Sequence, residues 1–436
     1  MSLVDKINNK SAKVGVIGLG YVGLPLAIEF TNAGYSVVGI DVDEKKVNKI
    51  NTGENYIKDV KDSELKNTVE KSLLIATTDF SEVRKLDALS ICVPTPLNKE
   101  KNPDISHIIS VMDEIKEHLH PNMLIVLEST TYPGSTKELI LPYILKNKNL
   151  RLDENIYLCF SPERIDPGNA IYNISNTPKI IGGITEKCAD IGKNLYSKII
   201  KKVITVSSTE TAEMVKLLEN TFRAINIGLA NEMAIMCEKL GVNVWEVIDA
   251  AATKPFGFMK FNPGPGLGGH CIPIDPYYLS WKLKNLDYDA RFIKLAGEIN
   301  TSMPKHVIDL ISVSLNDYKK SINGSKVLII GVAYKKDISD FRESPAIDII
   351  NLLVDAGAKL DYYDPFVPEL EIGNLSFKSL DGLKSEVVKS FDISVIITDH
   401  SNIDYNLIRL NSSSIIDTRN VYQNVKMESL KRLGEG

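Results

Sequence analysis

The chain contains 436 residues, 44% hydrophobic and 25% charged, with a formal net charge of -5 and a pI near 5.8. This length exceeds what one hydrophobic core usually serves, so two or three domains are expected. The mild negative charge argues against a nucleic-acid-binding protein and against attraction to an anionic membrane. The polar N-terminus is followed by an apolar stretch too short and too glycine-rich to span a bilayer, which predicts a cytoplasmic protein with no membrane partner.

Residues 1–208 alternate strand-like and helix-like patterns. Strands are expected at 13–19, 36–41, 73–78, 88–94, 123–129 and 156–162. Near-continuous apolar strands separated by helices predict a mainly parallel sheet that is covered on both faces. Two further short runs, KIIGG and KVITVSS, extend this first domain to about residue 208.

The middle of the chain is helical and the last part returns to alternation. A periodic, proline-free run that begins after Ser208 predicts one long helix, of the kind that connects domains or lies in an oligomer interface. We place the middle domain at 209–315 and a second α/β unit, which opens with KVLIIG, at 316–436. The expected fold class is α/β, with two Rossmann-like doubly wound domains joined by a long central helix and a helical middle domain.

A dinucleotide-binding fingerprint directly follows the first strand. It comprises Gly18, Gly20, Tyr21, Val22 and Gly23. The three glycines suit a tight turn, close approach of a pyrophosphate and close packing of the next helix on the sheet. Asp41 ends the next strand, where a carboxylate suits the ribose hydroxyls of NAD. No arginine follows it and Asp43 lies nearby, so NAD is favoured over NADP.

One cysteine lies in a glycine- and proline-rich loop, FNPGPGLGGHCIPID, at 261–275. The chain has five cysteines without paired spacing, and the other four lie in strand-like or helix-like runs typical of buried positions. Cys271 is therefore the candidate nucleophile, and we interpret the adjacent His270 as structural. Asp275 is a candidate catalytic carboxylate, although it could instead cap the following helix. The histidines show no metal-ligand spacing, so no metal is expected.

Several polar residues are candidate companions of Cys271. Lys216 and Asn220 are four apart on the long helix and could stabilise an oxyanion, although periodicity alone favours a solvated face. Glu163 follows a strand end and is the candidate general base; a surface ion pair with Arg164 is the alternative. Thr130, also past a strand end, could position a water.

Several motifs of the chain resemble the signatures of one family and occur in the same order as in that family. GLGYVGLPLA, ESTTYPGST, FSPERIDPGN, PGPGLGGHCIPIDP and GVAYKKDISDFRESPA are similar to signatures of the UDP-glucose/GDP-mannose dehydrogenase family over nearly the whole chain. Such enzymes oxidise the C6 alcohol of a sugar nucleotide to a carboxylate with two NAD+. The resemblance implies a homodimer formed through the central helix and a third domain that covers the UDP moiety.

The resemblance also implies a role for each site residue. Cys271 is implied as the nucleophile, while Lys216 and Asp275 would stabilise oxyanion charge through a water. Asn220 would help to hold that water and the substrate, and Glu163 would be the base for thioester hydrolysis with Thr130 as its partner. Expected cofactor-binding residues are Gly18, Gly20, Tyr21, Val22, Gly23, Asp41, Thr95, Thr130 and Arg342; expected substrate-binding residues are Glu163, Arg164, Lys216, Asn220, Gly268, Lys335 and Arg419.

The segment after Glu163 narrows the substrate. Glucose-type members tend to carry a second glutamate there, whereas this chain has Asp166 and Pro167. This resembles the subgroup that acts on UDP-N-acetylhexosamines in polysaccharide biosynthesis. The motifs STTYPG and ERIDPGN favour UDP-N-acetylglucosamine as the substrate. UDP-N-acetylmannosamine is the alternative, and UDP-glucose is a weaker one.

Two other functional classes share part of the pattern. A two-electron β-hydroxyacid dehydrogenase could share the fingerprint and the long helix, but it would not need Cys271. A non-catalytic NAD-binding sensor could keep the glycines and lose the chemistry. Neither class accounts for the glycine- and proline-rich loop.

Overall fold

The computed structural model spans the 436 residues and describes all of them except 58–59, 99–101, 167–168, 170 and 270. The chain forms two compact units, one of Met1–Glu219 with Tyr277–Tyr288 and one of Asn220–Pro276 with Asp289–Gly436. Helices α8 (Thr209–Leu240) and α10 (Asp275–Lys284) contribute residues to both units. The three-domain boundaries expected from the sequence stay a prediction.

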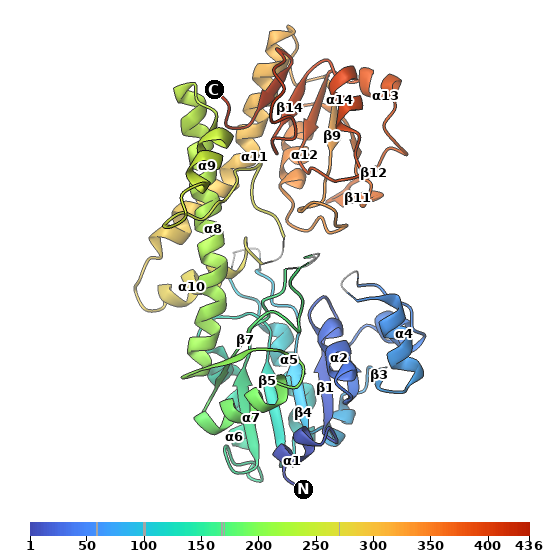
Figure 1. The fold of residues 1–436 in the computed structure, drawn as a ribbon, viewed down its shortest axis with the longest axis vertical. Helices are drawn as coiled ribbons and strands as arrows, with labels where there is room; N and C mark the ends of the chain where they lie inside the picture. Colours follow the sequence, from blue (N-terminus) through green and yellow to red (C-terminus); the bar gives the residue numbers. More distant parts are fainter. Residues whose placement is uncertain (58–59, 99–101, 167–168, 170, 270) are drawn as a thin grey trace. The chain divides into compact units, whose positions relative to one another are not determined.

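Unit 1 is built on an eight-stranded sheet with the order β3-β2-β1-β4-β5-β6-β7-β8 (Figure 1). Neighbouring strands are parallel except β6 and β7, which pair antiparallel. β1 lies between β2 and β4, and such a point of reversed strand order is where open sheets bind ligands. The strands are β1 (Lys13–Ile17), β2 (Ser36–Ile40), β3 (Leu74–Thr77), β4 (Ala88–Ile91), β5 (Met123–Leu127), β6 (Ile156–Phe160), β7 (Lys179–Gly183) and β8 (Val203–Val206).

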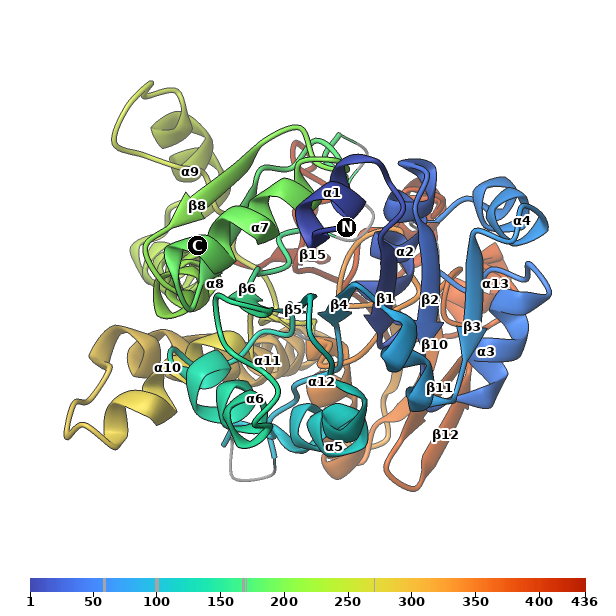
Figure 2. The same cartoon turned by 90° about the horizontal axis from the view of Figure 1, so that it is seen from below.

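Helices cover both faces of this sheet (Figure 2). One buried cluster joins the sheet to α1, α2, α4 and α7, and includes Phe30 and Leu195. The other joins it to α5 and α6, and includes Met112 and Ile144. Apolar side chains on both faces of the strands explain their near-continuous hydrophobic sequences. The helices are α1 (Leu3–Asn8), α2 (Gly23–Asn32), α3 (Glu44–Asn51), α4 (Asp62–Glu70), α5 (Ser106–Ile115), α6 (Leu141–Lys146) and α7 (Glu186–Tyr196), with short turns at Phe80–Lys85, Lys116–His118 and Thr136–Ile140.

Unit 2 contains a second, smaller α/β sheet with the parallel order β10-β9-β13-β14-β15. Buried clusters again lie on two faces, one with α11 and α12 and one with α13 and α14. The expected class of two Rossmann-like sheets is confirmed, but the β11–β12 hairpin was not foreseen. The elements are β9 (Lys326–Ile330), α12 (Pro345–Asp355), β10 (Lys359–Tyr363), β11 (Glu369–Ile372), β12 (Leu375–Lys378), α13 (Ser385–Lys389), β13 (Ile393–Ile396), α14 (Tyr405–Asn411), β14 (Ile415–Asp417) and β15 (Leu430–Arg432).

In its described part, unit 2 also contains the C-terminal part of α8, α9 (Val244–Ala252), the glycine- and proline-rich loop, and α11 (Arg291–Asp317). Asn231 on α8 donates its amide to Asn300 Oδ1 on α11 at 2.9 Å, and Asn300 in turn donates to the carbonyl of Ala224 at 3.1 Å. Both amides are buried, so this paired network fixes the register of the two helices. Within the described part of the chain, no helix combines the length and apolar character needed to cross a bilayer.

Candidate active site

The turn between β1 and α2 has the backbone geometry that the fingerprint requires. Gly18 has a φ of 89°, and a Cβ atom there would lie 2.6 Å from the carbonyl oxygen of Cys92. A Cβ on Gly23 would lie 1.8 Å from the carbonyl oxygen of Gly18. Both positions therefore exclude a side chain. Gly18 does so because of its backbone conformation and its close approach to Cys92, and Gly23 because α2 packs closely on the turn.

The rest of the fingerprint is open. Nothing described lies within 4 Å of a Cβ built on Gly20, Val22 is half-buried, and Tyr21 is exposed. Asp41 at the end of β2 accepts a hydrogen bond from the N–H of Leu19 at 2.8 Å, which ties its carboxylate to the turn. The turn thus has the open backbone and the adjacent carboxylate that suit a dinucleotide. Lys46 lies 3.4 Å from Asp41, a cation near this carboxylate that the sequence argument omitted.

The segments after β4 and β5 meet through two threonines. Thr95 Oγ1 donates to the carbonyl of Thr130 at 2.6 Å, and Tyr278 on α10 donates to the carbonyl of Thr95 at 2.7 Å. Thr130 is half-buried, whereas its neighbour Thr131 is 1% exposed and its hydroxyl has no hydrogen-bond partner among the described residues. Thr131 is therefore a second candidate hydroxyl, which sequence reasoning overlooked because the two threonines are adjacent.

Glu163 lies just past β6 and is held by the backbone. Its Oε1 accepts the N–H groups of Arg164 at 2.6 Å and Ile165 at 2.7 Å. Arg164 does not pair with it, because its guanidinium binds Glu219 at 2.6 Å and the carbonyl of Pro178 at 2.6 Å. The alternative of a Glu163–Arg164 ion pair is thus wrong for these residues. Lys179, which sequence reasoning did not single out, lies 3.9 Å from Glu163.

In unit 2 the structure joins three predicted residues. The N–H of Asp275 donates to the carbonyl of Cys271 at 2.8 Å, and the side-chain amide of Asn220 donates to the Asp275 carboxylate. Asp275 is the first residue of α10 and is 3% exposed. Cys271 is half-buried. The backbone of Cys271 and the side chains of Asp275 and Asn220 are therefore linked at the end of the glycine- and proline-rich loop.

Lys216 lies one helical turn before Asn220 on α8. Their exposed fractions are 8% and 6%, so the alternative of a solvated helix face is wrong. Burial of a lysine is costly unless its charge has a function or a partner, which makes Lys216 a candidate for chemistry. Lys216 belongs to unit 1 and Asn220 to unit 2.

The same loop packs against the second sheet's own loops within unit 2. Gly269 donates its N–H to the carbonyl of Arg342 at 3.2 Å. A Cβ on Gly268 would lie 2.6 Å from Cβ of Tyr334, and one on Gly264 would lie 2.7 Å from Nη1 of Arg419. The glycines thus let the backbone lie against an aromatic ring and a guanidinium.

Three expected substrate and cofactor residues of unit 2, Gly268, Arg342 and Arg419, thus lie in or against this loop. Lys335 follows Tyr334 in the chain, and Arg419 donates from Nε to the carbonyl of Ile397 at 2.7 Å. Arg342 is exposed and pairs with Asp340 at 2.6 Å. His270 and Pro167 lie outside the described residues. Among the described residues, no group of three or more His, Cys, Asp or Glu is placed to hold a metal ion.

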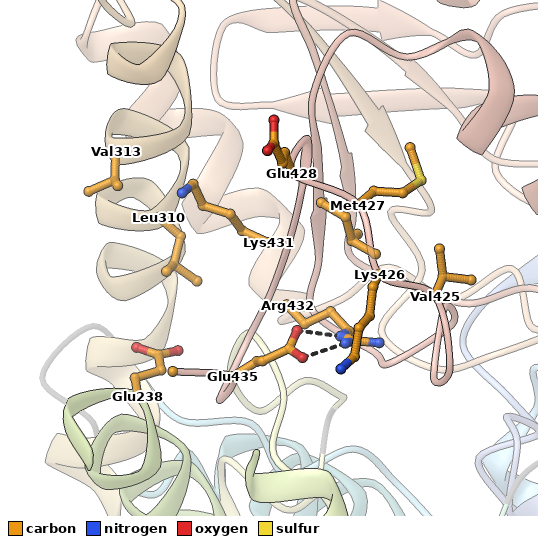
Figure 3. Close-up of a pocket in the computed structure, with 12 residues that line it drawn as sticks. Glu238, Leu310, Val313, Val425, Lys426, Met427, Glu428, Lys431, Arg432 and Glu435 are labelled. Carbon is orange, nitrogen blue, oxygen red and sulfur yellow. Dashed lines mark hydrogen bonds and ion pairs between the residues drawn. The ribbon is translucent and has the colours of Figure 1, made fainter. Parts of the chain in front are cut away.

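A cavity of about 680 Å³ in unit 2 lies away from these residues (Figure 3). It is bordered by α11 and the segment around β15, where Arg432 pairs with Glu435 at 2.6 Å. None of the predicted site residues lines it. Cavity volume alone therefore does not locate the chemistry of this chain.

Three domain sequences of one family match the chain: the NAD-binding domain over residues 12–200, the central domain over 210–302 and the UDP-binding domain over 328–424. A UDP-N-acetyl-D-mannosamine dehydrogenase of Methanococcus maripaludis is 38% identical, with 97% of each chain covered. A UDP-N-acetyl-D-glucosamine 6-dehydrogenase of Pseudomonas aeruginosa is 35% identical over 82% of this chain and 84% of its own.

A solved structure of a UDP-D-ManNAc dehydrogenase from Pyrococcus horikoshii is similar to this fold. It superposes with a TM-score of 0.88 at 33% identity, covering 97% of this chain and 99% of its own. The match of the NAD-binding domain identifies NAD as the cofactor of the first sheet. With all three domains matched in order, the chain belongs to the UDP-glucose/GDP-mannose dehydrogenase family.

Proposed function

We propose that this chain catalyses the NAD-dependent, four-electron oxidation of the C6 hydroxyl of a UDP-N-acetylhexosamine to the uronate. The observation that carries this proposal is the bonded chain of three residues in unit 2: Asn220 holds the Asp275 carboxylate, and the Asp275 N–H bonds to the backbone of Cys271. A two-electron hydroxyacid dehydrogenase would have no use for a thiol in that setting. The names of the relatives support the N-acetylhexosamine class, because those of Methanococcus maripaludis and Pseudomonas aeruginosa both act on N-acetylated UDP-sugars.

The residues divide the chemistry between them. NAD+, when bound, accepts the hydride in each of the two oxidations. The sulfur of Cys271 adds to the aldehyde carbon to form a thiohemiacetal, whose oxidation gives a thioester. Lys216 and Asp275 stabilise the developing oxyanion charge, and Asn220 holds the Asp275 carboxylate in place. The covalent bond keeps the aldehyde from leaving between the two steps.

Hydrolysis of the thioester needs a base. Glu163 takes a proton from a water molecule, the water oxygen bonds to the acyl carbon, and the C–S bond breaks to release the Cys271 thiolate. Thr130 is proposed to position that water, with the buried hydroxyl of Thr131 as the competing candidate. Gly268, Lys335, Arg164 and Arg419 are proposed to hold the UDP-sugar, and Arg342 to contact the cofactor.

The C2 epimer of the sugar is a separate proposal. The motifs STTYPG and ERIDPGN favour UDP-N-acetylglucosamine, but the relatives do not confirm that preference. Five UDP-N-acetyl-D-mannosamine dehydrogenases match at 36–38% identity over at least 91% of this chain, against 35% over 82% for the UDP-N-acetyl-D-glucosamine enzyme. We therefore place UDP-N-acetylmannosamine first and keep UDP-N-acetylglucosamine as the alternative.

The test is the amount of NADH formed per UDP-sugar consumed, measured in parallel on UDP-ManNAc, UDP-GlcNAc, UDP-GalNAc and UDP-glucose. Two NADH on one N-acetylated substrate would support the four-electron reaction and identify the epimer. One NADH per substrate would instead support the hydroxyacid class, and none with any sugar would support the sensor. A homodimer and a cytoplasmic location remain part of the proposal.

A further inference from the structure

A buried ion pair lies behind Glu163, and the reaction as described does not use it. Glu128 directly follows β5 and is 1% exposed, while Lys179 opens β7 and is 5% exposed. Lys179 Nζ lies 2.7 Å from Oε2 of Glu128 and 3.9 Å from Oε2 of Glu163. One buried ammonium therefore faces two carboxylates, one of which is the proposed base.

The strand order explains how Lys179 reaches this place. β6 and β7 pair antiparallel, with Phe160 opposite Gly182. The first residue of β7 therefore lies at the edge of the sheet where β5 and β6 end. Had β7 run parallel, Lys179 would lie at the opposite edge, away from Glu128 and Glu163. The antiparallel pairing of β6 and β7 thus places the Lys179 ammonium at the same edge of the sheet as Glu163, the proposed base.

The pair is itself held by buried polar groups. Tyr196 donates its hydroxyl to Oε1 of Glu128 and lies 2.9 Å from the hydroxyl of Ser90. Lys179 Nζ lies 5.2 Å from the centroid of the Tyr196 ring, a cation–π distance. Burial raises the pKa of the Tyr196 hydroxyl well above its ordinary value, so it stays a neutral donor. These contacts leave the Lys179 ammonium little freedom to move.

Glu163 has one oxygen fixed and one facing this pair. Its Oε1 is bound by two backbone N–H groups, and its Oε2 is the atom nearer to Lys179. We propose that Lys179 is a positioning residue that orients Glu163 for thioester hydrolysis, and that Glu128 offsets the charge of Lys179 beside that base. This inference rests on the proposed function and assigns two residues to its hydrolytic step.

Charge balance gives the physical reason. Two carboxylates and one ammonium carry a net charge of -1, and a proton taken up by Glu163 brings that charge to zero. Burial by itself would lower the pKa of Lys179, but Glu128 and then Glu163 raise it, so the ammonium stays charged. Among the described residues, the titratable groups around this cluster are Glu128, Glu163, Lys179, Tyr196 and Cys92, with the Arg164 guanidinium on the carbonyl of Pro178. Burial raises the pKa of Glu128, and the charge of Lys179 opposes that rise. Burial also raises the pKa of the Cys92 thiol well above its ordinary value. Cys92 is thus neutral and the two carboxylates and the lysine set the local field.

Opposite pH shifts in two variants test the proposal. Glu128→Gln leaves the Lys179 charge without its counter-charge, which stabilises ionised Glu163, so the acid limb of the hydrolysis rate moves to lower pH. Lys179→Met leaves Glu163 beside the uncompensated Glu128, so the limb moves to higher pH. Each shift is expected to be about one pH unit. In a single turnover, NADH formation reports the two oxidations that precede hydrolysis. The decay of the acyl adduct on Cys271, followed by mass, reports hydrolysis itself, and this adduct should accumulate in both variants.

Three further variants keep the test sharp. The double variant with Glu128→Gln and Lys179→Met buries no uncompensated charge and should have its limb between those of the single variants. Lys179→Arg, which keeps the positive charge, should retain most of the hydrolysis rate that Lys179→Met loses. Lys6→Met removes a partly exposed ion pair of similar length (2.6 Å) to Asp87, which directly precedes β4, and should leave the limb unchanged.

The possible outcomes separate the two proposals. Wild-type enzyme that yields two NADH, with both single variants shifted in the same direction or unshifted, would overturn the role of the pair and leave the four-electron reaction standing. Wild-type enzyme that forms no NADH from any UDP-sugar would overturn the proposed function, and this inference with it.

Discussion

At the scale of single residues, two glycines of one turn have separable tasks. Gly18 sits at a φ of 89° with no room for a Cβ, whereas a Cβ on Gly20 would meet nothing described within 4 Å. We expect Gly18→Ala to lower the free energy of unfolding by about 1–3 kcal/mol, because the strain falls on the backbone itself. Gly20→Ala should leave the melting temperature unchanged and weaken NAD binding by at least about tenfold.

Thermal melting and a fluorescence titration with NADH measure the two effects on the same samples. Comparing Gly18→Ala with Gly20→Ala separates the effect of backbone strain on stability from the effect of ligand contact on NAD binding, because both changes add one methyl group to the same turn. An unaltered NADH affinity in Gly20→Ala would show that the pyrophosphate does not lie over that glycine.

Cys271 carries the second prediction at this scale. Cys271→Ser should lower the rate of uronate formation at least about 1000-fold, because a hydroxyl is a far weaker nucleophile than a thiolate. NAD affinity should change less than about twofold, because the dinucleotide-binding turn and Asp41 belong to the first sheet and, in the described part of the chain, only Arg342 of the expected cofactor residues bonds to the loop of Cys271. Cys237→Ser is the control, since Cys237 is a buried thiol in the helical core of unit 2. Normal uronate production by Cys271→Ser would rule out the covalent mechanism.

The residues that sequence reasoning could identify are those whose signal is local. Gly18 and Gly23 are constrained by a turn of six residues, so their spacing already predicts the geometry. Arg419 contacts a glycine more than 150 residues earlier in the chain, and only resemblance to a family reached it. Thr131 was missed although it is adjacent to Thr130. The two threonines can be told apart only by which hydroxyl is buried, and the sequence does not show that.

At the scale of elements, β7 marks the limit of prediction. KIIGG was correctly expected as a strand, but an apolar run does not reveal whether it runs parallel or antiparallel to its neighbour. The antiparallel pairing decides that Lys179 joins Glu128 and Glu163. The long helix α8, in contrast, was foreseen almost residue for residue, because its periodicity is uninterrupted over Thr209–Leu240.

Helix α8 also carries an apolar stripe that faces solvent in the single chain. Phe222, Leu229, Met236 and Leu240 are 43%, 55%, 41% and 75% exposed, and their spacing of seven, seven and four residues places them along one side of the helix. Exposed apolar stripes of this kind usually mark protein interfaces. We expect Leu229→Glu to convert the proposed homodimer into a monomer, measured as a halved mass in light scattering.

The control for this change is Leu410→Glu on α14. Leu410 is 71% exposed but lies away from the stripe, so a charge there should leave the mass unchanged. If Leu229→Glu keeps the mass of the wild-type protein, the subunits do not associate through this side of α8.

At the scale of the whole molecule, the two sheets use the same device at the end of their first strand. Gly18 donates to the carbonyl of Ile40 at 2.8 Å, and Gly331, with a φ of 78°, donates to that of Tyr363 at 2.9 Å. The residue after each glycine donates to an aspartate, Leu19 to Asp41 at 2.8 Å and Val332 to Asp364 at 2.7 Å. The same backbone arrangement thus occurs once in each unit.

The two aspartates differ in what else they bind. Asp364 is 2% exposed and also receives N–H groups from Ala333 and Phe366 and a hydrogen bond from His400 at 3.0 Å. His400 accepts the N–H of Asp337 at its Nδ1, so its Nε2 carries the proton given to Asp364. We therefore expect Asp364 to serve stability in unit 2, and Asp41 to serve ligand binding in unit 1.

Substituting each aspartate by asparagine tests this division. Asp364→Asn should lower the free energy of unfolding of unit 2 by roughly 2–4 kcal/mol, because backbone donors would meet an amide instead of a carboxylate. Asp41→Asn should weaken NAD binding with a smaller loss of stability. The chain has two tryptophans, Trp245 in unit 2 and Trp281 in unit 1, so Trp281→Phe and Trp245→Phe backgrounds report the unfolding of each unit separately by fluorescence.

The pH dependence of that loss has a definite sign. Burial would raise the pKa of Asp364, but the hydrogen bond from His400 and the backbone N–H groups hold it below its ordinary value. The stability that the carboxylate contributes is therefore present at neutral pH and is lost as pH falls through the lowered pKa. The difference in unfolding free energy between wild type and Asp364→Asn should accordingly shrink as pH is lowered from 7 toward about 3. A difference that grows on acidification would mean that the carboxylate is protonated in the folded protein and that His400 does not hold it ionised.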